Sequence, residues 1–324
     1  MTKKEGQVKN RGLGACLMLT AAVIWGFAFS FQDRAGATLD TFGINALRFL
    51  IGGLVLIPVI YLFDRRATAP KRAVFALTRT ELVGGIFCGL AIGIASCFQQ
   101  AGILGADTGA GDAAFITALY VVMVPLISRL LGRRQPALVF VSALIAVVGF
   151  YFMTMADGGG FAPSVSDLFV LASAFVYSIH ILVIDFYSPK SDGVRLSMVQ
   201  FFTASLFSMP MMLFFERPTV TDVCAALPSL LYLGVFSCGV AYTFQVVGQK
   251  YASPAAASML LSLESVFGAI GGALLLGERM SDMQILGAAI VFSAILLSQF
   301  ADVLTAKCRR RGRENKRCHK RRSL

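Results

Sequence analysis

Long stretches almost free of charged residues dominate the chain. A helix needs about 20 apolar residues to cross the ~30 Å hydrocarbon core of a bilayer. Ten runs have about this length, namely Gly12–Phe31, Phe42–Phe63, Glu81–Leu104, Ala113–Leu131, Ala137–Met155, Val165–Tyr187, Leu196–Phe215, Leu227–Gly248, Pro254–Leu276 and Met283–Phe300. The pattern therefore predicts an all-α integral membrane protein with ten transmembrane helices joined by mostly short connections.

Charge is sparse and unevenly placed. Charged residues make up 15% of the 324 residues, against about 25% in ordinary soluble domains, so the composition does not fit a water-soluble fold. The formal net charge of +11 comes mostly from a basic tail, residues 301–324, which we expect to face the anionic inner leaflet. The charge is therefore no sign of nucleic-acid binding. The scattered cysteines lack the spacing of a metal site or a disulfide framework.

The distribution of Lys and Arg among the connections predicts the orientation. If segment 1–12 is cytoplasmic, the cytoplasmic segments hold 25 of the 29 basic residues, the opposite segments hold three, and Arg48 lies within a span. Such an excess marks the cytoplasmic face, so both termini are expected in the cytoplasm. Cleavage of a signal peptide near Ala35–Ala37 is disfavoured, because the first run is already long enough to span the bilayer.

The two halves of the chain resemble each other. At offsets of 152 and 146 positions, residues of the first half fall on identical residues of the second. The matched pairs are Phe49 and Phe201, Pro58 and Pro210, Phe63 and Phe215, Phe98 and Phe244, Gln99 and Gln245, and Gly102 and Gly248. We therefore expect two repeats of five helices, residues 13–155 and 165–300. Because five is odd, the second repeat is inverted, an architecture found mainly in secondary transporters with a site between the repeats.

Three segments carry a family resemblance. Ala21–Gly26, Leu47–Leu50 and Ala252–Gly287 are similar to the EamA-type members of the drug/metabolite transporter superfamily, and the similarity extends over nearly the whole chain in two copies. The resemblance implies a ten-helix solute carrier of the bacterial inner (plasma) membrane, commonly an exporter of amino acids or related metabolites, with a central cavity. The chain departs from the family pattern at Arg133, where Glu is usual, and at Phe31–Asp33, where a Lys is often seen.

Glu264 is the sharpest single candidate for function. It lies near the middle of a predicted span, where inserting a charged acid costs about 2.5–3.5 kcal/mol. The carboxyl must therefore be protonated, paired or exposed to a wet cavity. We expect it to line the solute site and to carry a coupling proton; a neutral carboxyl that only packs is the alternative.

His180 shares a helical face with Tyr177 and Ser173, which precede it by three and seven residues. An imidazole both donates and accepts hydrogen bonds and titrates near pH 6.5, so His180 is a second candidate for solute binding or proton transfer. A buried histidine that only makes hydrogen bonds fits the pattern equally well. Asp185, closer to the inner surface, is expected to anchor the end of the helix.

Amide and aromatic side chains complete the predicted solute site. Amides are costly toward lipid and should turn inward, and large rings suit the walls of a cavity. The candidates are Gln99, Gln245, Tyr177, Tyr242, Phe29, Tyr120 and Trp25, the single tryptophan. Both groups have a plain alternative, since amides also join helices and aromatic rings also fill bundle interiors.

Three prolines inside spans are candidate hinges for the motion of a carrier. Pro58 and Pro210 occupy matched positions, and Pro125 in the fourth span aligns with Ile270–Gly272 in the ninth. Each proline removes a backbone donor and tends to kink its helix. A static kink is the alternative, because proline is common in membrane helices.

Two further features concern packing. Arg48 lies about two turns into the second span, and it either extends to the outer surface or pairs with an acid in the cavity. Gly85, Gly89 and Gly93, at four-residue spacing, indicate a close contact between helices.

These features predict a secondary active transporter that exports a small metabolite, an amino acid or related compound, by alternating access, with proton coupling as a further hypothesis. A multidrug efflux carrier is the main alternative. Gly109–Asp112 matches a pattern of intramembrane aspartyl proteases, but no second mid-span aspartate accompanies it, so no enzymatic activity is expected. The expected partners are the solute, the lipid bilayer and the proton, without a metal, a cofactor or a nucleotide-binding motif.

Overall fold

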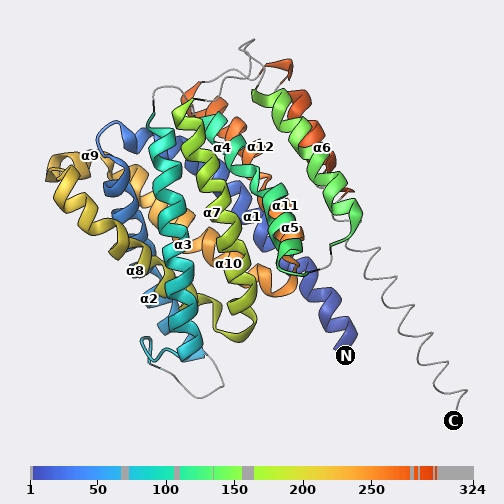
Figure 1. Cartoon of the computed structure of the whole chain (residues 1–324). Helices are drawn as coiled ribbons and strands as arrows, with labels where there is room; N and C mark the ends of the chain where they lie inside the picture. The colour runs from blue at the N-terminus through green and yellow to red at the C-terminus, as the bar shows by residue number, and fades with distance from the viewer. Residues whose placement is uncertain are drawn as a thin grey trace, which may run out of the picture.

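The polypeptide forms a bundle of helices in a computed structural model (Figure 1). The structure describes residues 3–66, 73–105, 110–133, 135–154, 164–277, 281–283, 285–294 and 296–297. Every regular element within these ranges is a helix, which confirms the predicted all-α class there. The basic tail 301–324, Gly109, and Glu278–Met280 of the sequence motif lie outside the described residues.

The helices follow the predicted order along the chain. The first half contains α1 (Lys3–Gly36), α2 (Thr41–Arg66), α3 (Arg79–Ile103), α4 (Ala110–Ala118), α5 (Tyr120–Leu130) and α6 (Ala137–Thr154). The second half contains α7 (Val165–Tyr187), η2 (Ser188–Lys190), α8 (Gly193–Met211), η3 (Met212–Glu216), α9 (Val220–Leu231), η4 (Tyr232–Tyr242), α10 (Thr243–Gly248), η5 (Gln249–Tyr251), α11 (Pro254–Leu261), α12 (Glu264–Gly271) and η6 (Gly272–Leu276). Segments η3, η4 and η6 are π-helices, and η2 and η5 are 3-10 helices.

Eight helical stretches of the described chain are long and apolar enough to cross a membrane. They are Gly12–Gly36, Thr41–Arg65, Arg79–Ile103, Ala110–Leu130, Val165–Lys190, Gly193–Glu216, Val220–Tyr251 and Pro254–Leu275. The described apolar helices at the fifth and tenth predicted spans, Ala137–Gly149 and Ile285–Ala294, are shorter. The multi-pass architecture is thus supported, whereas the count of ten spans stays a prediction.

The exterior of the bundle is apolar and much of its interior is polar. Leu144, Leu206 and Phe214 are 66%, 73% and 70% exposed, a surface that suits lipid and would aggregate in water. By contrast, serines, glutamines and a few ionisable groups are buried between the helices. In a bilayer such polar side chains face the bundle interior, where they pair with one another or line a wet cavity.

The fourth and ninth predicted spans are each broken at the same place. In the fourth span, α4 ends at Ala118 and α5 begins at Tyr120; in the ninth, α11 ends at Leu261 and α12 begins at Glu264. Leu119 and Leu263 have nearly equal backbone angles, φ −60° and ψ −12° against φ −59° and ψ −15°. Hydrogen bonds between residues three apart tighten both turns. The breaks place Tyr120 and Glu264 at the starts of the following helices.

The predicted glycine contact joins α3 to α8. A Cβ atom built on Gly85 would lie 2.4 Å from Val199 Cβ, and one on Gly89 would lie 2.5 Å from Thr203 Cβ. Only glycine allows this approach, so the prediction of a close contact between helices is confirmed.

The candidate hinges differ in their surroundings. Helix α2 continues without interruption through Pro58, whereas Pro210 lies two residues before η3 begins. Pro125 lies inside α5, six residues after the break at Leu119. The three hinge roles stay predictions, and the interruption in the fourth span does not coincide with its proline.

Ionic contacts join the two halves at the end of the bundle that carries the N-terminus (Figure 1). Arg133 at the end of α5 pairs with Asp185 of α7, in keeping with the predicted anchoring role of Asp185. Arg195 of α8 pairs with Asp64 of α2 at 2.5 Å. These pairs hold first-half helices to second-half helices at a distance from the middle of the bundle.

Candidate functional site

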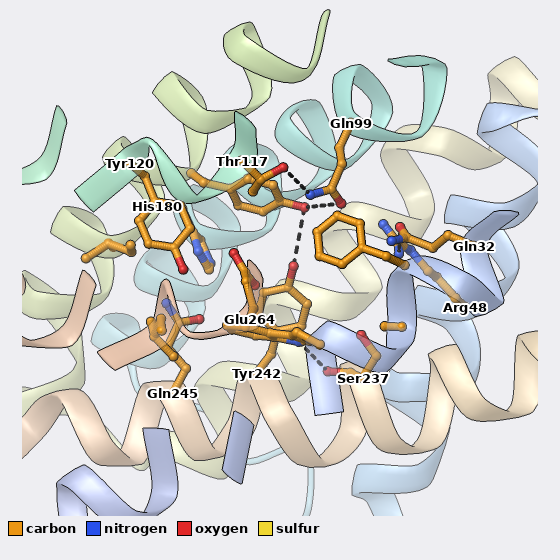
Figure 2. A pocket seen from close by; sticks show the side chains of 16 residues that line it. Gln32, Arg48, Gln99, Thr117, Tyr120, His180, Ser237, Tyr242, Gln245 and Glu264 are labelled. Carbon is orange, nitrogen blue, oxygen red and sulfur yellow. Dashed lines mark hydrogen bonds between the residues drawn. The ribbon is translucent and has the colours of Figure 1, made fainter. Parts of the chain in front are cut away.

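A cavity lies between helices of both halves, and the empty space in it, including the part that is open to solvent, is about 460 Å³. Its lining comes from α1, α2, α3, α4, α5, α7, η4, α10, α11 and α12. The lining residues are Trp25, Ala28, Phe29, Gln32, Arg48, Gln99, Thr117, Tyr120, Tyr177, His180, Ile181, Ser237, Tyr242, Gln245, Leu261 and Glu264. Figure 2 shows their side chains converging from helices that are distant in sequence.

All nine residues predicted for the solute site line this one cavity, namely Trp25, Phe29, Gln99, Tyr120, Tyr177, His180, Tyr242, Gln245 and Glu264. The prediction named neither Gln32 nor Thr117, although each lies three residues from a named aromatic on the same helical face. Ser237 was also missed. It precedes Tyr242 by five residues within η4, and this π-helical spacing is absent from an ordinary helical pattern.

Tyr177 is the centre of a hydrogen-bond network beside the cavity, and the network also includes the labelled Gln99, Thr117 and Tyr242 of Figure 2. Its hydroxyl donates to Gln99 Oε1 at 3.3 Å and lies 3.0 Å from the hydroxyl of Ser96. Tyr242 Oη donates to Tyr177 Oη at 3.4 Å, and Gln99 Nε2 donates to Thr117 Oγ1 at 3.1 Å. The network fixes α3, α4, α7 and η4 relative to one another.

Trp25 and Tyr242 form the aromatic wall. Their ring centroids are 4.4 Å apart with an interplanar angle of 54°. Trp25 Nε1 donates to the backbone oxygen of Ser237 at 3.2 Å, which ties α1 to η4. The wall therefore joins the first half of the chain to the second.

Within the described residues, His180 lies against the ring of Tyr242 and makes one side-chain hydrogen bond, to Gln200. Its Nε2 is 3.2 Å from Gln200 Oε1, and its ring meets that of Tyr242 edge-on with centroids 6.0 Å apart. Nδ1 is buried and has no hydrogen-bond partner among the described residues. Ser173, predicted on the same face, instead donates to the backbone oxygen of Val170.

Glu264, Tyr120 and Gln245 each bring an unsatisfied polar atom to the cavity. Gln245 Oε1 is buried without a hydrogen-bond partner in the described part of the chain, and Glu264 Oε1 and Tyr120 Oη make no hydrogen bond of ordinary geometry there, although these two groups lie close enough to interact with each other. Buried polar atoms are nearly always hydrogen-bonded, to protein or to ordered water. Such a concentration of free polar atoms around one cavity indicates that its contents, water or a solute, supply the missing partners.

One of the two expectations for Arg48 is wrong, and the other, a pair with an acid, is not met among the described residues. The residue is 3% exposed and lines the cavity, so it does not extend to the outer surface. The ion pairs found among the described residues do not include it. Instead, Nη1 donates to Gln32 Oε1 at 2.6 Å. The cavity interior offers a neutral amide at a position that sequence alone could not place next to Arg48.

Comparison with known families concerns the two halves of the chain whose helices line the cavity. The family model for the EamA-like transporter family matches residues 12–155 and again residues 164–300. The chain belongs to the EamA-like transporter family. The two matches cover both halves that contribute to the cavity, so this membrane transporter builds its central cavity from two copies of one family unit.

Relatives of this EamA-like transporter agree with that assignment. A protein of Archaeoglobus fulgidus named an uncharacterized transporter is 29% identical over 281 residues, covering 85% of this chain and 82% of the relative. A second uncharacterized transporter, from Methanothermobacter thermautotrophicus, is 23% identical over 312 residues, covering 91% and 88%. A solved crystal structure with a TM-score of 0.73 and 19% identity covers 90% of this chain and 98% of its own, and it supports the fold alone.

Proposed function

We propose that this EamA-like transporter is a secondary active carrier that exports a small metabolite, an amino acid or related compound, by alternating access. The observation that carries the proposal is the cavity lined by both family units, with free polar atoms of Arg48, Glu264, Tyr120, His180 and Gln245 around it. Such a site, at the junction of two repeats, is where secondary transporters bind their solutes.

A two-fold relation between the two halves is supported by the way the helices pack, and the odd number of spans expected in each half makes this relation an inverted one. Helix α3 packs against α7 and α8, and its counterpart in the second half, η4 with α10, packs against α1, and η4 also against α2. In the same way, α4 and α5 pack against α7, while α11 and α12 pack against α1. Exchanging the halves preserves these contacts, as a two-fold axis requires. We infer ten spans in two inverted repeats.

Alternating access requires helices that change shape near the site. The matched breaks at Leu119 and Leu263 interrupt one span of each half beside the cavity. Interruptions in corresponding places of two repeats are typical of transporter sites. We propose that rocking of the halves, with flexing at these breaks and at Pro58, Pro125 and Pro210, opens the cavity to each face in turn.

Glu264 is the proposed site of proton coupling, with His180 as a second candidate. Its carboxyl begins α12 directly after a break and lines the cavity together with Tyr120. A carboxyl here can exchange its proton when the cavity opens to water, so proton loading and solute binding are able to alternate. We further infer a plasma-membrane protein with both termini cytoplasmic, since basic residues concentrate on that predicted side.

A resistance screen tests the carrier and its solute class. The protein is overexpressed in a sensitive bacterial host that is challenged with toxic amino acids, amino-acid analogues, amines and drugs. We expect resistance to amino-acid analogues, confirmed by transport in liposomes. Resistance only to drugs without amino-acid character would favour the alternative, a multidrug efflux carrier, and no transport of any compound would contradict the proposed function.

Proton coupling is tested in liposomes with an imposed pH gradient and the solute found in the screen. We expect Glu264→Gln to reduce gradient-driven uptake at least tenfold, about 1.4 kcal/mol, while solute exchange at equal pH persists. Asp33→Asn, which neutralises an exposed acid of α1 outside the cavity lining, is the matched control. Equal pH-driven uptake by wild type and Glu264→Gln would remove the coupling role.

A further inference from the structure

Arg48 brings a buried positive charge to one end of the cavity. The residue lies in the third turn of α2 and is 3% exposed. Figure 2 shows Arg48 and Gln32 together at one end, with Tyr120, His180 and Gln245 at the other end and Glu264 between. The side chain therefore faces the cavity contents rather than lipid or bulk water.

One edge of the Arg48 guanidinium is free. Nη1 donates to Gln32 Oε1 at 2.6 Å. Nε and Nη2 are buried and have no hydrogen-bond partner among the described residues. These two atoms lie side by side on one edge of the planar group, and this edge binds both oxygens of a carboxylate in parallel. Gln32 thus accepts a hydrogen bond from Nη1, the one guanidinium nitrogen that does not contact a carboxylate bound at this edge.

No acid among the described residues neutralises Arg48. The ion pairs found there join Arg133 to Asp185, and Arg195 to Asp64 and Asp192. The Phe49 ring, 5.0 Å from the guanidinium carbon, stabilises the cation through its π-face but carries no opposite charge. Because arginine keeps its charge at any physiological pH, this end of the cavity retains an uncompensated cation in a costly environment.

We propose that Arg48, held by Gln32, is the anchor for a carboxylate group of the transported solute. This inference rests on the proposed carrier function and names the chemistry of its site. Nε and Nη2 would donate to the two carboxylate oxygens, so the solute supplies both the missing charge and the missing acceptors. The rest of the solute then lies toward Glu264 and the aromatic wall.

The lining favours a carboxylate over a phosphate. Arg48 is the only Lys or Arg among the described residues that line the cavity. A single carboxylate balances this one charge, whereas a phosphate group would bring further negative charge next to Glu264 without a second cation. The same argument disfavours amines that lack a carboxylate, because nothing in such solutes pairs with Arg48.

Trp25 provides a direct readout of the cavity. It is the single tryptophan of the chain and it lines the cavity, so intrinsic tryptophan fluorescence of the purified full-length protein reports binding there. The probes are four acid and amide pairs of matched shape, namely glycine, leucine, glutamine and phenylalanine with their α-carboxamides. Melting temperatures with and without each probe give a second measurement.

We expect wild type to bind at least one acid ten times more tightly than its amide, and Arg48→Gln to lose this preference. Arg48→Lys, which keeps the charge but not the two-nitrogen edge, should retain part of it. Arg129→Gln, a change at an exposed arginine outside the cavity, should behave as wild type. Melting temperatures of the unliganded variants establish that they fold.

The anchor would be overturned if no acid binds to wild type, if acid and amide bind equally, or if Arg48→Gln keeps the preference. Sodium chloride and sodium phosphate are titrated in parallel. Stabilisation by chloride that matches the acids and depends on Arg48 would assign the subsite to an inorganic counter-ion, and the solute anchor would be wrong. Transport of amines but not of acids in liposomes would support the carrier function and contradict the role of Arg48 as a carboxylate anchor. Binding of acids through Arg48 without any transport would contradict the carrier function but not the carboxylate site.

Discussion

Two ionisable groups of opposite kind line the cavity and are held in different ways: Arg48 at one end, and Glu264 between that end and the side formed by Tyr120, His180 and Gln245, which together with Glu264 is called the Glu264 end. Arg48 projects from an uninterrupted part of α2 and is fixed by Gln32 of α1, sixteen residues away in sequence. Glu264 begins α12 directly after a break, and its surroundings come from α5, α7 and α10 as well. Arg48 is thus set within a continuous helix of the first half, and Glu264 at the first position of a helix of the second half that follows a tightened turn.

From this difference we propose separate roles for the two groups, solute recognition for Arg48 and coupling to a gradient for Glu264. Arginine does not lose its proton in proteins, so the Arg48 end suits constant recognition of one solute group. A carboxyl beside a helix break is able to change both position and protonation, so the Glu264 end suits the step that couples binding to a gradient. The following predictions test this comparison, beginning with the largest effect.

The largest effect is expected where α12 crosses α1. A Cβ atom at Gly26 would lie 2.3 Å from Phe267 Cβ and 2.6 Å from the Phe267 backbone carbon. Gly26→Ala should therefore push α12 and Glu264 away, at a cost of about 3 kcal/mol, the upper part of the usual range for overpacking. The melting temperature should fall and transport should be lost.

Gly12→Ala is the matched control, because a Cβ atom there meets nothing within 4 Å. Its melting temperature should equal or exceed that of wild type, since alanine favours helix over glycine by about 1 kcal/mol. Equal stability and equal transport of the two variants would mean that the close packing of α12 on α1 is not needed to hold Glu264 in place for transport.

A smaller loss of stability is expected from the ion pair between Arg195 and Asp64, remote from both cavity ends. The Arg195 side chain is 4% exposed and keeps only the longer contact to Asp192 at 3.5 Å when Asp64 is changed. Asp64→Asn should cost about 2 kcal/mol, below the 3–5 kcal/mol of a fully buried pair. Thermal unfolding of the purified protein measures this cost.

Asp185→Asn is the control for that change, because Arg133 is 42% exposed on its side chain. Exposed pairs contribute about 0–1 kcal/mol. Neither variant should alter the ratio of acid to amide affinity, which depends on the Arg48 end. A changed ratio in either one would show that the recognition end is not independent of contacts between the halves.

The smallest effect in energy is expected from giving Arg48 an acid of its own. Gln32→Glu keeps the side-chain shape and places a carboxylate where Oε1 already accepts at 2.6 Å. Neutralising the guanidinium should weaken binding of acids about tenfold, or 1.4 kcal/mol, without lowering the melting temperature. Unchanged affinity in the Trp25 fluorescence titration would count against the anchor.

All nine residues predicted for the solute site line the cavity because the membrane restricts where polar side chains can lie, while their role in solute binding stays a prediction. Polar and ionisable side chains in the middle of apolar runs are costly toward lipid and therefore lie in the bundle interior. Gln99, His180, Gln245 and Glu264 could each be predicted in this way from the sequence of a single helix. The direction and the partner of the Arg48 side chain could not be predicted in this way. Its partner Gln32 lies on another helix, and the register between two helices is set by packing that no single run reveals.

The interruptions were only partly foreseen. The prolines predicted hinges at Pro58, Pro125 and Pro210. The fourth span is instead interrupted at Leu119 and the ninth at Ser262 and Leu263, and neither place carries a helix-breaking residue. Likewise, the π-helical turns of η4 bring Ser237 to the cavity at a spacing of five. Such departures from regular helix are stabilised by contacts across the bundle, including the hydrogen bond from Trp25 to Ser237.

The class of this protein follows from its sequence, because apolar runs of bilayer length require helices and duplication of one family unit indicates a site between two halves. The chemistry of that site depends on the packing of the helices. Packing places a charged Arg48 beside a neutral amide and leaves one edge of its guanidinium without a hydrogen-bond partner among the described residues, because solvation and partners depend on which helices meet. Periodicity describes one helix face, whereas an unpaired charge is a property of several helices at once.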